Sequence, residues 1–227
     1  MNDIRKPRWG LVPESWEAHS IGDVAQVKGG KRLPKGDKFA EGPTPFPYIR
    51  VTDFAEFAID TSDLRYLRFD TQASIKRYTI STRDVYISIA GSIGITGMIP
   101  PELEGANLTE NAAKIVITTS DVEARFLMYF LGSETAQKEI QSQTVKNAQP
   151  KLALARIASL KIPVPSVEEQ REIVQALDIL GQKQMVANQK KRLFSDLFHT
   201  LLHQLMTAQI RIHDLDLSFL EQEAVGG

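Results

Sequence analysis

The most constraining feature of this sequence is a long stretch without proline near its C-terminal end. From Val167 to about Ile212 there is no proline and only one glycine, Gly181. Ser166 and Glu169 have the S-x-x-E spacing of a capping box, which marks the start of a helix. A helix of about 45 residues would be roughly 65–70 Å long, about twice the diameter of a small domain. We therefore expect most of this helix to project from the part that precedes it.

Apolar residues recur along this stretch in two series with seven-residue spacing. One series is Ile173, Leu180, Ala187, Phe194, Leu201 and Ala208, and the other is Leu177, Gln184, Lys191, Phe198, Leu205 and Ile212. An isolated helix would leave this stripe in water, so we expect it to pair with a second helix as a coiled coil. The predicted dimerisation residues are Ile173, Leu177, Leu180, Phe194, Phe198, Leu201 and Leu205. The alternative is a hairpin of two shorter helices that folds back at Gly181, although a glycine costs only about 1 kcal/mol inside a helix.

The part before this helix has the pattern of an α+β domain in which strands outnumber helices. Five short runs rich in β-branched residues are bounded by Gly, Pro, Asp or Asn, at residues 19–30, 47–54, 84–91, 95–100 and 112–119. One helix is expected from an N-cap at Asp121 to about residue 143, with Gly132 as the point where it ends or splits.

A proline-flanked strand closes this domain. Leu160, Ile162 and Val164 alternate as a last strand, while Pro163 and Pro165 exclude it from the centre of a sheet. The sequence therefore predicts two parts. Residues 1–165 form a β-rich globular domain, and residues 166–227 form the long helix with a C-terminal tail.

The composition argues against several classes of protein. The chain has no cysteine, which excludes disulfides, thiolate zinc sites and a cysteine nucleophile. No apolar run approaches the roughly 18 residues of a membrane span, and no apolar signal region follows the first basic residues, so we expect a cytoplasmic protein with no membrane partner. The glycines at 91, 94 and 97 fit no nucleotide-binding motif, and the pair His199 and His203 lacks a third ligand. We predict no catalytic residue, no metal and no cofactor.

One segment is strongly basic although the net charge of the chain is only −1. The sequence KGGKRLPKGDK, residues 28–38, carries five basic residues and one aspartate. Cations of this kind hold DNA phosphates, and the glycines allow the backbone to approach closely. Charge alone leaves open the alternative of a solvated surface loop.

Several stretches together resemble the specificity subunit of type I restriction-modification systems. They are PESWEAHSIGDVAQVKGGKRLPK, PYIRVTDF, ISIAGSIGITGMI, NAAKIVI and LKIPVPSVEEQREIVQALD, and the similarity runs from about Leu11 to Ile212. The most specific piece is IPVPSVEEQREIV, at the junction of strand and long helix.

The resemblance implies that residues 1–165 are a target recognition domain that reads double-stranded DNA. It also implies that the long helix pairs as an antiparallel coiled coil and binds methyltransferase subunits, and through them a motor-nuclease subunit. The usual family member has two recognition domains and two long helices, whereas this chain has one of each. We therefore expect a half-length form, natural or truncated, that works as a homodimer or with another half and itself catalyses nothing.

The predicted DNA-binding residues are the loop cations together with polar residues at other turns. They are Lys28, Lys31, Arg32, Lys35, Lys38, Arg50, Thr52, Asp53, Ser88, Ser92, Asn111, Lys146, Asn147, Gln149 and Lys151. Arginine, asparagine and glutamine are the side chains best suited to base edges. A structural pair of Arg50 with Asp53, and hydroxyls of Ser88 and Ser92 that only satisfy turn backbone, remain alternatives.

Two functions follow from different parts of this pattern. In the first, two identical domains about 65 Å apart read inverted half-sites separated by roughly two turns of B-DNA. The alternative is an assembly module or anti-restriction decoy that captures the methyltransferase through its helix without reading DNA.

Overall fold

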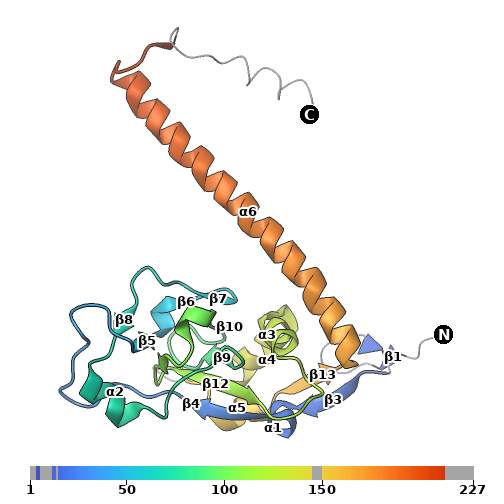
Figure 1. The fold of residues 1–227 in the computed structure, drawn as a ribbon. Helices are drawn as coiled ribbons and strands as arrows, with labels where there is room; N and C mark the ends of the chain where they lie inside the picture. Colours follow the sequence, from blue (N-terminus) through green and yellow to red (C-terminus); the bar gives the residue numbers. More distant parts are fainter. Residues whose placement is uncertain (1–3, 6–11, 14, 145–149, 213–227) are drawn as a thin grey trace. The chain divides into compact units, whose positions relative to one another are not determined.

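The computed structural model describes residues 4–5, 12–13, 15–144 and 150–212, and Figure 1 shows its ribbon. Backbone contacts divide the chain into two compact units, residues 1–175 and 176–227. The first unit combines short strands and helices, and the second continues a long helix. This arrangement confirms the predicted class, a strand-rich α+β domain followed by a long helix.

The strands are short. They are β1 (Ile4–Arg5), β2 (Val12–Pro13), β3 (Glu17–Ser20), β4 (Ala25–Gly29), β5 (Pro47–Ile49), β6 (Phe54–Ala55), β7 (Ala58–Ile59), β8 (Arg65–Tyr66), β9 (Val85–Ser88), β10 (Thr96–Gly97), β11 (Asn107–Leu108), β12 (Ala112–Ile117) and β13 (Lys161–Val164). The α-helices are α1 (Ile21–Val24), α2 (Phe69–Ile75), α3 (Ala124–Gly132), α4 (Glu134–Gln143), α5 (Leu154–Ser159) and α6 (Val167–Met206). Short 3-10 helices cover Val51–Asp53 and Pro101–Leu103.

The largest sheet has the strand order β10-β9-β12-β4, and all its pairs are antiparallel. In β12 the fully buried Ala113 and Ile115 alternate with the partly exposed Lys114, as expected for a strand with one face in the core. Leu127 and Leu131 of α3 are also fully buried in this core cluster. Burying each large apolar side chain stabilises the fold by about 1.5–3 kcal/mol.

A second sheet, β11-β5-β8, lies after the basic segment in the chain, with β11 parallel and β8 antiparallel to β5. A small core beneath it contains the buried Tyr48, Leu67 and Ile75. Partly buried aromatic residues, Phe46 and Tyr78 among them, pack against this cluster. The second sheet also shares a core cluster with the first, in which Ile49 and Leu108 are buried together with Tyr86 and Ala112.

The proline-flanked strand is confirmed as a strand outside the main sheet. β13 pairs antiparallel with β3 alone, and Pro163 lies opposite Ala18. Because proline has no backbone N–H to donate, a two-stranded pair accommodates it where a central position would not.

The first predicted strand run, residues 19–30, is wrong as one element. The turn of α1 interrupts it between Ser20 and Ala25. The Asp23 carboxylate accepts the backbone N–H of Ser20 at 2.7 Å, and Ile21 donates to the carbonyl of Leu160 at 2.9 Å. This local cap and the burial of Ile21 favour a helical turn over continued strand.

The helix predicted from Asp121 to about residue 143 is two helices, α3 and α4, and its N-cap is Glu123 instead of Asp121. The split at Gly132 is confirmed. Ser133 has an extended backbone, and its hydroxyl accepts the N–H of Ala136 at 3.3 Å, so it caps α4. The ring of Phe57 occupies the space that a Cβ at position 132 would need.

The long helix is continuous, so the hairpin alternative at Gly181 is wrong. α6 runs through Gly181 and ends at Met206, six residues short of the predicted Ile212. At its start the Ser166 hydroxyl accepts the N–H of Glu169 at 3.2 Å, as in a capping box. The Glu169 carboxylate instead accepts the indole N–H of Trp16 at 3.1 Å.

Judged by length and hydropathy together, the described helices include none that could span a bilayer.

Candidate nucleic-acid interface

Several of the predicted residues meet at one end of the four-stranded sheet. β4 and β9 end there and β12 begins there, because Ala113 is in register with Gly29 and Ala112 with Ser88. The segment that follows β4 is the basic loop, residues 28–38. The antiparallel register therefore brings Lys28, Ser88 and the exposed Asn111 to the same end of the sheet.

Gly30 fixes the first turn of the basic loop against the second sheet. A Cβ at this position would lie 2.1 Å from the carbonyl oxygen of Thr109 and 2.3 Å from that of Leu108. The N–H of Lys31 donates to the Leu108 carbonyl at 2.8 Å, and the Tyr48 hydroxyl donates to the Lys31 carbonyl at 2.8 Å. Burial raises the pKa of Tyr48, so this hydroxyl remains a donor. Glycine is needed here for close backbone approach.

Beside this turn lies a cleft of about 370 Å³ with three basic side chains in its lining. Its lining residues are Lys28, Gly29, Gly30, Arg77, Tyr78, Thr79, Leu108 and Lys114. The Arg77 guanidinium lies 5.1 Å from the centre of the Tyr78 ring, and the Lys31 ammonium 5.8 Å from it. Cations over an aromatic face are held by the ring quadrupole. The cleft therefore presents positive charge around one tyrosine.

Arg77, Tyr78 and Lys114 were not predicted from the sequence. Arg77 and Tyr78 follow α2, and Lys114 is opposite Lys28 in the β12–β4 register. Lys114 forms an ion pair with the buried Asp84 at 2.9 Å, which compensates one of the charges. The consecutive basic residues before Tyr78, in the sequence KRY, were the available signal.

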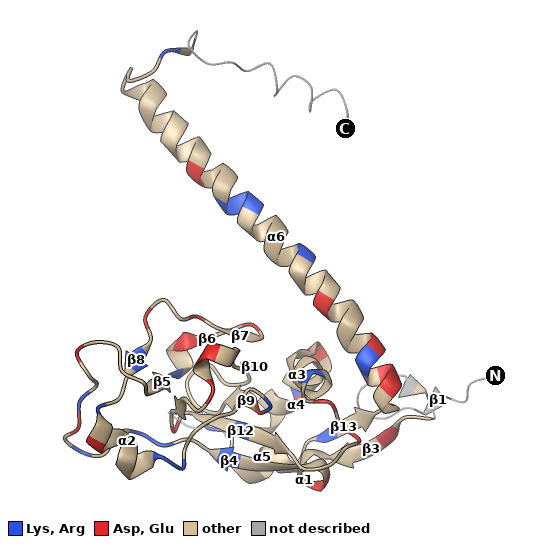
Figure 2. Ribbon diagram, viewed as in Figure 1, with Lys and Arg blue, Asp and Glu red and all other residues tan. Residues whose placement is uncertain are grey.

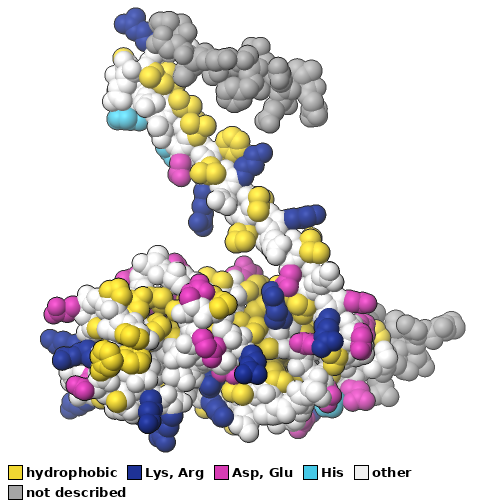
Figure 3. Space-filling view, in the orientation of Figure 1, with side chains coloured by type: hydrophobic (Ala, Val, Ile, Leu, Met, Phe, Trp, Pro, Cys, Tyr) yellow, Lys and Arg dark blue, Asp and Glu magenta, His cyan; other side chains and the backbone are white. Residues whose placement is uncertain are grey.

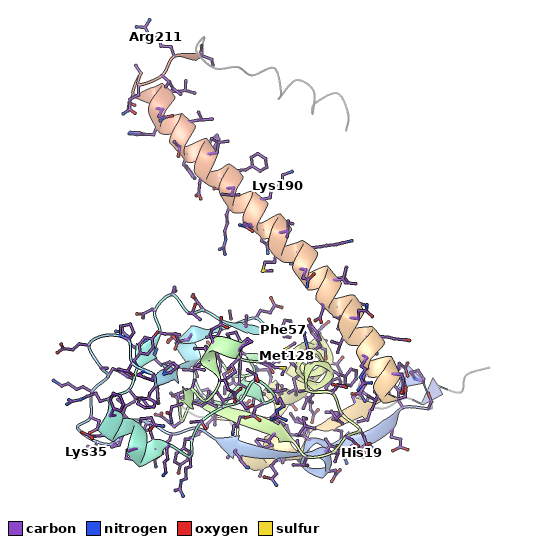
Figure 4. The ribbon with its side chains drawn as sticks, in the orientation of Figure 1. His19, Lys35, Phe57, Met128, Lys190 and Arg211 are labelled. Atoms are coloured by element: carbon purple, nitrogen blue, oxygen red, sulfur yellow. The ribbon has the colours of Figure 1, made fainter. Side chains whose placement is uncertain are left out.

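The rest of the basic loop is exposed and tied to α2. The Thr71 hydroxyl of α2 donates to the Asp37 carboxylate at 2.7 Å. Lys35 and Lys38 are exposed, and Figure 4 shows Lys35 next to α2. Arg32 is exposed as well and pairs with Glu110 at 3.2 Å. Hydrogen bonds thus anchor the loop at Lys31 and Asp37, while the side chains of Lys35 and Lys38 are exposed.

The two basic segments on either side of this contact carry most of the local charge. Residues 28–38 contain five basic residues against Asp37, and residues 65–78 contain four against Asp70. Figure 2 shows Lys and Arg gathered around α2, β8 and the segment after β4. A surface with this excess of cations attracts the DNA backbone through release of its counterions.

Arg50, Thr52 and Asp53 form a separate group after β5. The guanidinium of Arg50 donates to the buried Asp53 carboxylate at 3.1–3.2 Å and to the carbonyl of Asp63 at 2.6 Å. The hydrogen bond with Asp53 raises the pKa of Arg50. These contacts favour the structural pair for Arg50 and Asp53, whereas Thr52 is exposed.

The turn after β9 assembles three other predicted residues. Ile89 and Ala90 donate their N–H groups to the Asn111 carbonyl at 2.8 and 3.3 Å, and Ala90 forms a bridge with Lys151. The fully buried Ser88 accepts the N–H of Ile95 at 2.8 Å, so its hydroxyl serves the turn. Ser92, Asn111 and Lys151 are exposed. Lys146, Asn147 and Gln149 lie outside the described residues.

The predicted dimerisation stripe follows α6 into the second unit. Leu180, Phe194 and Phe198 are 61, 56 and 61% exposed, whereas Ile173, Leu177, Leu201 and Leu205 are half-buried. A second series of exposed apolar residues was not predicted from the sequence. It consists of Ile179, Val186 and Leu193, which are seven residues apart, and Leu197. Together the two series make a broad apolar face, wider than one coiled-coil seam.

The sequence profile described as "Type I restriction modification DNA specificity domain" matches residues 13–193. The chain belongs to this family. It is 23% identical over 218 residues to the type I restriction enzyme MjaVIII specificity subunit of Methanocaldococcus jannaschii, covering 94% of this chain and 50% of that protein. It is 26% identical over 174 residues to the EcoBI specificity subunit of Escherichia coli, covering 75% and 36%.

Solved structures of the type I family share its fold. The HsdS subunit from Thermoanaerobacter tengcongensis aligns with a TM-score of 0.57 and 21% identity, covering 81% of this chain and 41% of that one. The S subunit from M. genitalium aligns with a TM-score of 0.57 and 16% identity, covering 96% and 51%. The family resemblance seen in the sequence is thus confirmed, and the chain spans about half the length of the curated relatives it matches.

Proposed function

We propose that this type I specificity-family protein is the DNA sequence-specificity subunit of a restriction-modification complex and reads one half of a bipartite target. The observation that carries the proposal is the cationic surface formed by the basic loop, the Tyr78 cleft and α2 within the matched specificity domain. Phosphate contacts would come from Lys28, Lys31, Arg32, Lys35 and Lys38. These contacts would orient the domain on the duplex without themselves specifying sequence.

Base readout would come from the polar residues at the end of the sheet. The backbones of Asn111 and Lys151 contact that of Ala90, and Ser92 follows in the same turn. Asparagine can pair bidentately with adenine. Arg77 is a further candidate for a contact with guanine, because its planar guanidinium lines the cleft beside Tyr78. The other DNA-binding residues predicted from the sequence remain proposed contacts. They are Arg50, Thr52, Asp53, Ser88, Lys146, Asn147 and Gln149.

The proposed division of labour assigns DNA reading to residues 1–165 and association to residues 166–227. Two copies of the 40-residue α6 would pair antiparallel through the exposed stripe. A helix of this length measures about 60 Å, close to two turns of B-DNA. Because a two-fold pair repeats the same reader at each end, the target would be an inverted repeat with unread base pairs between its halves.

The chemistry is assigned to partners. We propose that α6 binds methyltransferase subunits and, through them, a motor-nuclease subunit, and that this chain is not itself an enzyme. The complex would work in the cytoplasm on double-stranded DNA, without a membrane partner. A helix-only assembly module or decoy is not favoured, since the matched family is a DNA specificity domain.

The test combines methylation mapping with binding measurements. Cells that carry the complete system should methylate one bipartite, inverted-repeat sequence, and the assembled complex should bind that duplex at least about 1,000-fold more tightly than unrelated DNA. The logarithm of its affinity should fall linearly with the logarithm of salt concentration. An assembled complex without any sequence preference would establish the assembly module instead.

A further inference from the structure

Phe69 is the first residue of α2. Its side chain is 65% exposed. Among the described residues of the first unit it is the only large apolar side chain with such exposure, since the others all lie in α6 or at Ile212. A single exposed apolar residue is common on protein surfaces, so its exposure alone indicates no function. Its support and its surroundings are what distinguish Phe69.

The ring of Phe69 is held in place from below. It makes an edge-to-face contact with Phe46, with ring centres 5.0 Å apart and an interplanar angle of 88°. Phe46 packs on the small core of the second sheet, and its carbonyl accepts the N–H of Leu67 at 2.8 Å. The Thr44 hydroxyl donates to the Leu67 carbonyl at 2.8 Å and accepts the N–H of Phe46 at 3.2 Å. Phe69 is thus a supported aromatic side chain presented to solvent.

Basic residues surround Phe69. Arg68 precedes it in the chain, and the loop that carries Lys35 and Lys38 is tied to the first turn of α2 through the Asp37–Thr71 hydrogen bond. Figure 3 shows hydrophobic side chains at the end of the domain that carries α2, with Lys and Arg around them. Such a charge pattern favours a polyanion over a cationic partner.

A duplex held by these cations would meet both ends of α2. The seven residues of α2 span about 10 Å, or about three base pairs at 3.4 Å each, and Arg77 lies just beyond the C-terminal end of the helix. The phenyl ring has no donor or acceptor, so it gains nothing from a phosphate. On DNA its apolar partners are the thymine methyl group and the exposed face of a base step.

We propose that Phe69 is a specificity-determining residue that contacts the bases of the bound duplex through its apolar ring, while the surrounding cations hold the phosphates. The proposal rests on the proposed function and deepens it. It assigns base readout to a residue outside the polar set and predicts a contact whose free energy does not depend on salt.

The test compares Phe69→Ala and Lys35→Ala with the wild-type chain, each assembled with methyltransferase subunits, on a duplex selected from random sequence. Phe69→Ala should weaken specific binding by about five- to 100-fold for each copy of the chain in the complex, the range for one lost base contact. The slope of log affinity against log salt should stay unchanged for Phe69→Ala. Lys35→Ala should lower that slope by about 0.9 for each copy, the value for one phosphate contact.

Two further arms identify the base contact. If the partner is a thymine methyl, replacing thymine by uracil in the site should weaken wild-type binding by the same factor, and Phe69→Ala should be indifferent to the replacement. If the ring inserts between two stacked bases, a 2-aminopurine placed at that step should become more fluorescent when the wild-type complex binds. Its fluorescence should not increase with Phe69→Ala.

Three results would overturn the inference. One is equal affinity and equal selectivity of Phe69→Ala and wild type, and another is a reduced salt slope for Phe69→Ala. The third is impaired assembly of Phe69→Ala with the methyltransferase subunits, combined with normal DNA affinity of the complex that does assemble. That result would mean that the ring contacts the methyltransferase and not the DNA. Thermal unfolding of Phe69→Ala checks its fold. A wild-type complex without sequence preference would instead refute the proposed function, whatever Phe69→Ala does.

Discussion

Gln170 offers the sharpest test of how the first turn of the long helix is attached to the domain. It is the only fully buried residue in the described α6. Its side-chain N–H₂ donates to the carbonyls of Asp121 at 2.7 Å and Pro165 at 2.9 Å, and its side-chain oxygen accepts the N–H of Glu123 at 2.8 Å. These partners fix the orientation of the amide, since two carbonyls require donors and one N–H requires an acceptor.

Replacement by methionine keeps an unbranched chain of similar length but removes all three hydrogen bonds. Each bond contributes about 1 kcal/mol net, and an unsatisfied buried group costs about 1–3 kcal/mol. We therefore expect Gln170→Met to lower the free energy of unfolding by at least about 3 kcal/mol, a large fraction of the 5–15 kcal/mol typical of a domain. With a urea m value of about 2 kcal/mol/M, the midpoint would fall by roughly 1.5 M.

Urea unfolding followed by circular dichroism measures this shift. The matched control is Gln175→Met on the same helix, where the side chain is exposed, and it should lie within about 0.5 kcal/mol of wild type. Hydrogen exchange at the N–H of Glu123 should accelerate in Gln170→Met because its acceptor is gone. Equal midpoints for the two variants, with a protected Glu123 N–H in both, would refute the role assigned to Gln170.

Three further substitutions test the loop, the helix and its association. Gly30→Ala would place a Cβ 2.1 Å from the Thr109 carbonyl, so we expect a loss of about 1–3 kcal/mol in urea unfolding, against no loss for Gly42→Ala, whose Cβ meets open space. Gly181→Ala also meets open space and should stabilise α6 by about 0.5–1 kcal/mol, seen as a higher melting temperature of the helical signal. Phe198→Glu, at a 61% exposed position, should convert a dimer to a monomer in light scattering while its helical content remains.

Each of these has a result that contradicts it. A Gly30→Ala protein as stable as Gly42→Ala would mean that the loop relaxes without cost. A Gly181→Ala protein that melts at a lower temperature would mean that a neighbour occupies that face of α6. A wild-type chain that is monomeric at micromolar concentration, or a Phe198→Glu chain that stays dimeric, would remove the stripe from the proposed interface.

The long helix and the strand before it could be predicted because their signals are local. Ser166 supplies the cap, Pro163 restricts the pairing of its strand, and the absence of proline allows helix through Gly181. Each of these effects acts within a few residues of chain. The same holds for the basic loop, whose five cations lie within the eleven residues 28–38.

The predictions that went wrong depended on contacts from distant segments. The predicted helix is split at Ser133, beside the glycine that the ring of Phe57 requires at position 132, and Leu160 holds the turn that interrupts the first strand run. A propensity pattern contains no term for such neighbours. The Arg50–Asp53 pair was an open alternative for the same reason, because only the position of Asp63 completes its hydrogen bonds.

The sequence by itself determined the class of fold, the family and the presence of a cationic segment and an apolar helix face. Only the tertiary structure decided which cations act together. Arg77 and Lys114 are 37 residues apart in the chain, and they share a cleft with Lys28 because strand register and the packing of α2 bring them there. Local periodicity is written in neighbouring residues, whereas a binding surface depends on which strands pair and which core lies beneath them.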